Sequence, residues 1–324
     1  MSQMHKNPNN TFDDVRTMLL NPETASVRVA QLDKDLTVQE LSSHFFRNIH
    51  NQIKQQVGSA VRDCVVTVPY TLDADMRKRL TEAAQAGGMR VKACIDDSVA
   101  ALMAHQLDDA SLPPGKTVVL DIGWSQTNVS LYNVSGGMFL PVASSTLPDV
   151  CGKVFVNLVA AHCAKDFARK AKFPCDDNKR SMMRLRTECE NAMKSLSTGA
   201  ETMLDIDSLC EGVDFSHKLS RARFEDLLTT PFMQLKSGVN ALLAQAGWAA
   251  SDVRQVIMSG GGSSIPKVIS SMKAIFSAAK FPVGRFESLE TQCLGAALHG
   301  KYLSEQVCSL TAPLISVPYN TPPL

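Results

Sequence analysis

The chain has 324 residues, a formal net charge of +1 at pH 7, and a composition of 44% hydrophobic and 20% charged residues. This length can bury a large core and allows two domains. The balanced charge offers no general attraction to nucleic acid or to an anionic membrane. Nine cysteines without a Cys-x-x-Cys pair, and a polar beginning without an apolar leader, favour a reducing compartment. We therefore expect a cytoplasmic protein that contacts neither nucleic acid through a basic patch nor a membrane.

The first third of the chain alternates helices with short apolar strands. Strands are expected at 64–68 and 91–95, with a helix between them that begins after Asp73 and ends at Gly87. An earlier helix carries four apolar residues at a spacing of four on one face: Leu41, Phe45, Ile49 and Ile53. A further helix is expected over 99–107. The order helix, strand, helix, strand, helix predicts an α/β fold with parallel strands.

A β-meander and a group of helices are expected in the rest of the chain. The meander follows a linker-like stretch, Pro113-Pro114-Gly115, and contains a glycine-rich hairpin. The expected strands lie at 118–123, 129–134, 138–143 and 201–206. The expected helices lie at 152–167, 181–197, 232–245, 265–276 and 293–306, with a shorter one that Ser220 caps.

The most informative segment is a glycine-rich turn, Ser259-Gly260-Gly261-Gly262-Ser263-Ser264, that follows an apolar strand and precedes a helix. Glycines without a Cβ let backbone N–H groups approach a ligand, and the start of a helix favours an anion. Neither a P-loop nor a Gly-x-Gly-x-x-Gly motif occurs, so neither of those nucleotide-binding folds is supported.

Two carboxylates also lie at strand ends. Asp121 ends the strand before Gly123, and Asp97 follows the strand at 91–95. Ligands collect beyond the carboxyl ends of strands in open α/β sheets. The three strand ends together therefore indicate a nucleotide site, in which Asp97 and Asp121 would hold Mg²⁺ through water. The alternative is that the two carboxylates are helix or turn caps.

Several segments together match one protein family. They are 65–70, 95–101, 118–130, 185–197, 206–209, 211–215, 220–225 and 260–267. Through them, residues 7–306 resemble the nucleotide-binding domain of the seventy-kilodalton heat-shock chaperones, whose fold is a two-lobed, actin-like ATPase fold. Within that family, the stretches 182–185 and 195–198 are most similar to the atypical, ribosome-associated members.

The resemblance implies an incomplete domain. It predicts a truncated first lobe over 1–110, a second lobe over 111–306 and a disordered tail over 307–324. Residues 7–13 match what normally follows the family's first phosphate-binding hairpin and catalytic lysine, so we expect both to be absent. The sheet of the first lobe should then lack its opening hairpin. We also expect the substrate-binding domain that should follow residue 306 to be missing.

The resemblance also assigns residues to the site. It implies that Asp97 stands for a glutamate near the metal-bound water and that Asp121 belongs to the second phosphate loop. Ser264 stands for an arginine that stacks on adenine, and Lys194 stands for another arginine. The residues implied to contact ATP or ADP are Gly123, Gly152, Glu190, Lys194, Ser197, Gly260, Gly261, Gly262 and Ser264, with Mg²⁺ held through Asp97 and Asp121.

Departures from the family pattern weaken the expected activity. Trp124, Ser125 and Gln126 replace two glycines and a threonine, and an indole is a steric problem where a backbone must approach phosphate. Leu289 replaces a ribose-side aspartate. We therefore expect a chaperone-family domain that binds nucleotide, assists protein folding and hydrolyses ATP weakly or not at all.

The implied partners are a J-domain cochaperone, a nucleotide-exchange factor or the ribosome. One alternative is a non-enzymatic scaffold for a J-domain cochaperone or a ribosome partner. The other is a small-metabolite kinase of actin fold, which would need a sugar-binding insertion that we do not find in the sequence.

Overall fold

The computed structural model describes residues 26–29, 34–59, 61–284 and 286–306. Residues 7–13, on which the expectation of an absent hairpin rests, and the tail 307–324, expected to be disordered, lie outside the described residues. None of the described helices combines the length and the apolar character needed to cross a bilayer.

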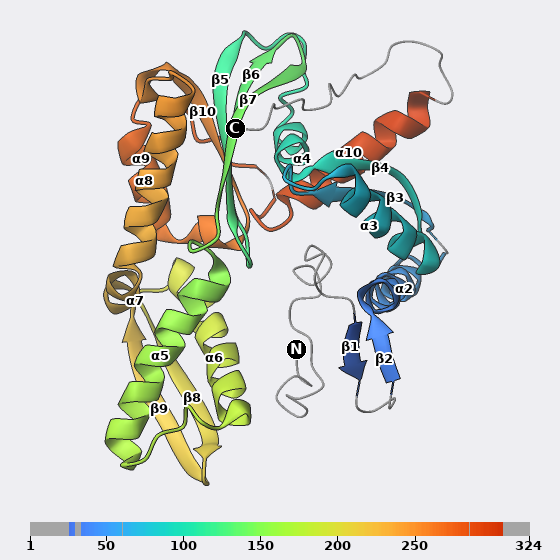
Figure 1. Ribbon diagram of the computed structural model, residues 1–324. Helices are drawn as coiled ribbons and strands as arrows, with labels where there is room; N and C mark the ends of the chain where they lie inside the picture. The colour runs from blue at the N-terminus through green and yellow to red at the C-terminus, as the bar shows by residue number, and fades with distance from the viewer. Residues whose placement is uncertain (1–25, 30–33, 60, 285, 307–324) are drawn as a thin grey trace.

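A four-stranded sheet, here called the main sheet, has the most strands of any sheet among the described residues and lies in the upper part of Figure 1. Its strands are β5 (Gly115–Ile122), β6 (Thr127–Ser135), β7 (Met138–Leu147) and β10 (Val253–Ser259), in the order β10-β5-β6-β7. The strands β5, β6 and β7 form the predicted antiparallel meander, and β10 runs parallel to β5.

The two faces of the main sheet join two different cores. Along β5, Val118, Leu120 and Ile122 join the large core, whereas Val119 joins a smaller one with the helix α4 (Asp97–Ala104). This division follows from the strand period of two, which sends successive side chains to opposite faces. Figure 1 accordingly shows α4 on one side of the sheet and the helices α8 and α9 on the other.

The large core joins the main sheet to five helices and a hairpin. The helices are α5 (Gly152–Ala171), α6 (Lys179–Thr198), α7 (Arg221–Leu227), α8 (Thr229–Gln245) and α9 (Pro266–Ile275). The hairpin pairs β8 (Glu201–Cys210) with β9 (Val213–Ser220). Predicted helices and the Ser220 cap are confirmed here, whereas β9 was not predicted.

A smaller sheet pairs β3 (Asp63–Val68) with β4 (Arg90–Asp96) in parallel. The helix α3 (Ala74–Ala86) connects the two strands, and Asp73 caps it as predicted by accepting a hydrogen bond from the backbone N–H of Met76 at 2.7 Å. Among the described residues this small sheet has two strands. Two further strands, β1 (Ser26–Val29) and β2 (Lys34–Thr37), form a separate antiparallel pair before α2 (Val38–Val57).

The last helix, α10 (Thr291–Gln306), lies apart from the second-lobe elements with which the sequence analysis grouped it. It packs against α4 and β3, beside the small sheet (Figure 1). A Cβ at Gly295 would lie 1.8 Å from the carbonyl oxygen of Ala100, so the two helices approach each other too closely for a side chain there. The boundaries at residues 110 and 306 stay predictions, but this helix belongs with the first-half elements.

One local prediction was wrong. In α2 the buried aromatic residue is Phe46, whereas Phe45, placed on the buried face from its spacing, is 49% exposed. Before α4, Asp96 occupies the N-cap position without a side-chain cap and instead pairs with Arg77 at 2.7 Å. The ion pair can replace the helix cap, because either interaction gives the carboxylate oxygens a hydrogen-bond partner.

Candidate functional site

The glycine-rich turn and Asp121 lie side by side. Ser259 at the end of β10 is in register with Asp121 at the end of β5. Gly260 has a φ of +79°, and a Cβ there would lie 2.7 Å from Oδ1 of Asp121 and 2.4 Å from the carbonyl oxygen of Ile122. Gly260 is therefore needed both for its backbone angle and for this close approach.

The third predicted strand end, which carries Asp97, meets the end of β5 across a small cavity. Asp97 at the start of α4 and Asp121 are both buried, with 4% and 8% of their surface exposed. They line a cavity of about 10 Å³ together with Tyr70, Ser98, Val119, Asn128 and Ser130. A cavity of this size holds about one water molecule. The two carboxylates thus line the same small cavity, and their role in holding Mg²⁺ stays a prediction.

A buried row of polar side chains borders this cavity and was not predicted. On β6, Asn128, Ser130 and Tyr132 alternate with apolar residues. The Tyr132 hydroxyl bonds Ser98 Oγ at 2.8 Å, which links the main sheet to α4. Ser130 Oγ accepts from Ser144 at 3.1 Å. The period-two polar pattern from 128 to 132 is the sequence signal that could have revealed this row.

One buried hydroxyl at the same edge has no partner among the described residues. Ser259 is 1% exposed, and its Oγ makes no hydrogen bond there. Buried polar groups are nearly always bonded, so an exception marks a place where a water or another polar group fits. It lies next to the glycine turn, at the strand end that the sequence predicted to be functional.

The beginning of α5 is bonded to the turn after β5. The N–H of Gly152 donates to the carbonyl oxygen of Gly123 at 3.0 Å, and the N–H of Lys153 donates to that of Trp124 at 2.9 Å. A Cβ at Gly152 would lie 3.1 Å from Cε3 of Trp124. Gly123 and Gly152 are therefore neighbours, as expected for a shared site, but they bond to each other.

Residues 288 and 289 cover the glycine turn. The N–H of Gly260 donates to the carbonyl oxygen of Ser288 at 3.1 Å, and Ser264 and Ser288 share a 2.9 Å hydrogen bond between their hydroxyls. A Cβ at Gly261 would lie 3.2 Å from Cδ2 of Leu289, a side chain that is 64% exposed. At Gly262 a Cβ would lie 2.3 Å from Cγ2 of Ile122, which gives this glycine a packing role.

The predicted purine-side residues share one face of α6. Glu190, Lys194 and Ser197 follow a spacing of four and three, which places them along one stripe of the helix. Lys194 Nζ bonds Glu190 Oε1 at 2.6 Å, and Ser197 Oγ donates to the carbonyl oxygen of Met193 at 3.1 Å. These bonds stay within α6, so the role of this stripe in holding a nucleotide stays a prediction.

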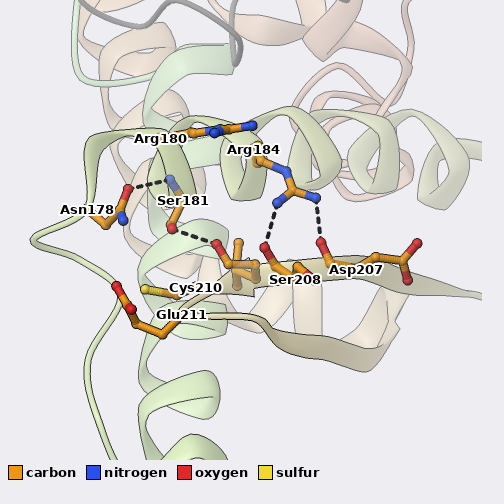
Figure 2. Close-up of a pocket in the computed structure, with 9 residues that line it drawn as sticks. Asn178, Arg180, Ser181, Arg184, Asp207, Ser208, Cys210 and Glu211 are labelled. Atoms are coloured by element: carbon orange, nitrogen blue, oxygen red, sulfur yellow. Dashed lines mark hydrogen bonds between the residues drawn. The ribbon is translucent and has the colours of Figure 1, made fainter.

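A polar groove of about 490 Å³ lies at the opposite end of α6, between its first turns and β8 (Figure 2). Arg184 donates to the carbonyl oxygens of Ser208 at 2.8 Å and Asp207 at 2.6 Å, and Ser181 Oγ donates to that of Leu209 at 2.6 Å. The register of β8 against β9 shifts at this point, and Ser208 has a φ of +46°. The α6 side chains thus donate hydrogen bonds to carbonyl groups at the point where the pairing of β8 with β9 is interrupted.

The described residues hold no group of three or more His, Cys, Asp or Glu side chains arranged to bind a metal ion. At the start of α5, burial raises the pKa of the Cys151 thiol. That thiol therefore stays protonated at neutral pH, and its Sγ lies 3.5 Å from the carbonyl oxygen of Pro148. The chemistry available at the strand ends is thus that of two carboxylates, several hydroxyls and backbone amides.

Comparison with known proteins gives a consistent result. Residues 7–312 match the family described as Hsp70 protein. Heat shock 70 kDa protein 14 of Xenopus tropicalis is 33% identical over 77% of this chain and 49% of its own length. The protein of the same name from Pongo abelii is 33% identical over 82% of this chain and 49% of its own length. A heat shock 70 kDa protein of Trichophyton rubrum is 31% identical over 86% of this chain and 42% of its own length.

The chain thus spans about half the length of the curated relatives it matches. The family match covers both sheets, α6, the glycine turn and all of α10 within one continuous range. The chain belongs to the Hsp70 family of heat-shock chaperones, and its fold is the actin-like ATPase fold of that family's nucleotide-binding domain, in a partial two-lobed form.

Proposed function

We propose that this chain is a nucleotide-binding module of a chaperone that binds adenosine nucleotides through its second lobe and hydrolyses ATP very slowly or not at all. The observation that carries the proposal is the meeting of two strand ends, where Gly260 lies against Asp121. Hsp70 proteins in general bind nucleotide with Mg²⁺. In an α/β sheet such an edge is the usual place for a ligand.

The nucleoside side of the proposed site suits a ligand. The α6 stripe offers a carboxylate, an ammonium and a hydroxyl, which can hydrogen-bond the edge of a purine and the hydroxyls of a ribose. At Gly261 the nearest side-chain neighbour is Leu289, whose 64% exposure leaves it free to move aside. We propose that a nucleoside lies between this stripe and the turn at Gly261.

The metal and phosphate side does not suit a bound magnesium triphosphate. The cavity between Asp97 and Asp121 has room for about one water molecule, so a phosphate group with its metal would have to widen it. Phosphoryl transfer depends almost wholly on positioned cations and backbone donors. At this site the first two N–H groups of α5 already bond carbonyl oxygens. This supports slow or absent hydrolysis.

Binding is tested by isothermal titration with ADP. We expect Gly261→Val to weaken ADP binding by about tenfold or more, because a branched side chain would occupy the nucleoside position. The control is Gly300→Val on α10, where a Cβ would make only an ordinary 3.5 Å contact with Val65. Equal ADP affinity for Gly261→Val and the wild type would remove the proposed placement.

Hydrolysis is tested by a single-turnover assay with labelled ATP. We expect the wild type to release phosphate no faster than a variant carrying both Asp97→Ala and Asp121→Ala. Clear turnover in the wild type that the double variant loses would show that the two carboxylates assemble a working site after all.

Hsp70 chaperones in general work with J-domain cochaperones and nucleotide-exchange factors, and we propose the same kinds of partner here. The small cavity also favours a second candidate, a scaffold that binds such a partner without nucleotide. The two are distinguished by thermal melting, because a ligand that binds the folded state raises Tm. An unchanged Tm with both ADP and Mg-ATP would favour the scaffold. A cytoplasmic location and ribosome association stay predictions.

A further inference from the structure

We infer that the turn 123–126 closes the phosphate side of the site, so that the chain recognises the nucleoside and gains no affinity from phosphates or Mg²⁺. The inference rests on the proposed function, because it concerns the ligand of the same site. It assigns Trp124 a role in specificity, since this residue joins the closed turn to the start of α5.

Main-chain hydrogen bonds hold the turn closed. Its own ends are joined by the N–H of Gly123, which donates to the carbonyl oxygen of Gln126 at 3.0 Å. The carbonyl oxygens of Gly123 and Trp124 then accept the N–H groups of Gly152 and Lys153 at 3.0 and 2.9 Å. A phosphate at the start of α5 would have to displace both carbonyl oxygens, and each displaced group would then need a new partner.

The neighbouring segment fastens the turn from the other side. Thr127 Oγ1, at the start of β6, donates to the carbonyl oxygen of Val150, two residues before α5. The turn is thus tied to the 150–153 segment at three points. The positive end of the α5 helix dipole, which would otherwise attract an anion, faces carbonyl oxygens.

The Trp124 side chain adds a steric barrier to this closure. Its ring lies against Gly152, where a Cβ would come 3.1 Å from Cε3, and the side chain is 38% exposed. The indole therefore covers backbone that a phosphate would need to touch. The buried carboxylates of Asp97 and Asp121 at the same edge would repel a phosphate that arrives without its metal.

The experiment measures Kd by isothermal titration for adenosine, AMP, ADP and ATP, each with and without Mg²⁺. For the wild type we expect the four values to agree within about threefold and to be unaffected by Mg²⁺. Trp124→Gly removes the indole and makes the turn easier to open, because glycine adopts more backbone conformations. We expect this variant to bind Mg-ADP about tenfold more tightly than adenosine. Ser125→Gly, which loosens the same turn but keeps the indole, should behave as the wild type does.

Each other outcome has a defined meaning. A wild type that binds ADP or ATP about tenfold more tightly than adenosine would overturn the inference and leave the proposed nucleotide binding intact. If Trp124→Gly is folded by circular dichroism and shows no phosphate preference, the indole is not the barrier. If no member of the series binds either protein, the proposed function fails, and the inference fails with it. Should Trp124→Gly not fold, the wild-type series still decides.

Discussion

The main sheet and the small sheet have similar apolar strands and very different surroundings. In the main sheet, β5 is buried at every position from Thr117 to Ile122. In the small sheet, β3 is buried only at Val68, and its other apolar residues are partly exposed. Both strands have a parallel partner and a β-branched, apolar sequence. The difference therefore comes from what covers them.

Helices cover both faces of the main sheet, and the large core extends from it into five of them. The corresponding core around α2 and α3 is small, with Phe46, Ala83 and Ala84 as its buried residues. The first half thus depends on α4 and α10, which pack on each other beside β3. An apolar, β-branched segment therefore predicts a strand, but helices far away in the sequence decide how deeply that strand is buried.

The largest expected effect comes from truncating a large side chain in each core. Phe155 is fully buried and contacts Phe232 edge to face at 6.0 Å, whereas Phe46 is 9% exposed in the smaller core. We expect Phe155→Ala to lower the free energy of unfolding by about 4 kcal/mol and Phe46→Ala by about 2 kcal/mol. Urea denaturation of both variants measures this. Equal losses would mean that the small core is as tightly packed as the large one.

The second effect tests whether the contact of α4 with α10 supports the first half. Gly295→Ala would place a Cβ 1.8 Å from the carbonyl oxygen of Ala100, so the two helices must separate. We expect a loss of about 3 kcal/mol and faster amide hydrogen exchange in α4, α10 and β3. Gly300→Ala on the same helix meets Val65 at an ordinary 3.5 Å and should be neutral or slightly stabilising. Faster exchange confined to β5 and β6 would contradict this division of the molecule.

The sequence predicted most of the site's placement, because parallel strands bring their carboxyl ends to one edge. Asp121 and Gly260 follow neighbouring parallel strands of the main sheet, and the structure places them side by side. Asp97 follows a strand of the small sheet, and it reaches Asp121 across the small cavity. The glycine-rich turn and the family resemblance predicted a ligand role for Gly262 as well. The structure supplies a different reason for that glycine, since it packs against Ile122. A packing contact between distant residues leaves no periodic signal.

Other features depended on tertiary contacts that no local pattern contains. The choice between Phe45 and Phe46 is set by which face of α2 meets α3, and both residues fit a helical stripe. The bond of Ser98 to Tyr132 depends on how α4 docks on the main sheet. The closed turn at Trp124 depends on where α5 begins relative to β5. Trp124 stands out in the sequence as a departure from the family pattern, but the sequence does not show which groups its backbone bonds.

As the pH falls, the helices α4 and α10 of the first half should lose stability at a higher pH than the one at which the buried carboxylate of the second half is protonated. Burial lowers the pKa of His105 at the end of α4 and of His299 on α10. In the unfolded chain these imidazoles take up protons near pH 6.5. The unfolded state then binds more protons, so stability falls as the pH drops through about 6.5 toward the folded pKa values. The protection factors of the amides in α4 and α10, which correct for the slower intrinsic exchange in acid, should therefore fall between about pH 7.5 and 5.5.

The second half holds a carboxylate whose stabilising effect is also lost in acid, but at a lower pH. Burial tends to raise the pKa of Asp166, but hydrogen bonds from Lys170, His217 and Arg169 outweigh it and lower that pKa. Its stabilisation is complete above the unfolded value near 3.9 and is lost only as the pH falls below it. Burial also lowers the pKa of His162 on α5, so α5 has its own response to acid and serves as the internal control. The double variant His105→Gln, His299→Gln should lose the acid-induced drop in amide protection in α4 and α10. The acid response of the amides in α5 should stay as in the wild type.

The smallest effect compares the same kind of helix cap in the two halves. Asp73 accepts from the N–H of Met76 at 2.7 Å at the start of α3, and Asn178 accepts from the N–H of Ser181 at 3.1 Å at the start of α6. Removing either cap leaves one helix N–H without its partner, so each alanine variant should cost about 1 kcal/mol. The global loss should be alike, because the local interaction is alike.

The local consequence of losing each cap should differ between the halves. The buried positions of α3 are two alanines, whereas α6 buries Leu185, Cys189 and Leu196 in the large core. Asp73→Ala should therefore increase hydrogen exchange along most of α3, and Asn178→Ala should increase it only in the first turn of α6. Helical stability in proteins comes mainly from the packed apolar face, so a cap matters most where that face is small. If the increased exchange spreads equally along both helices, packing stabilises α3 and α6 to the same degree. The difference in size between the two cores would then not determine the stability of their helices.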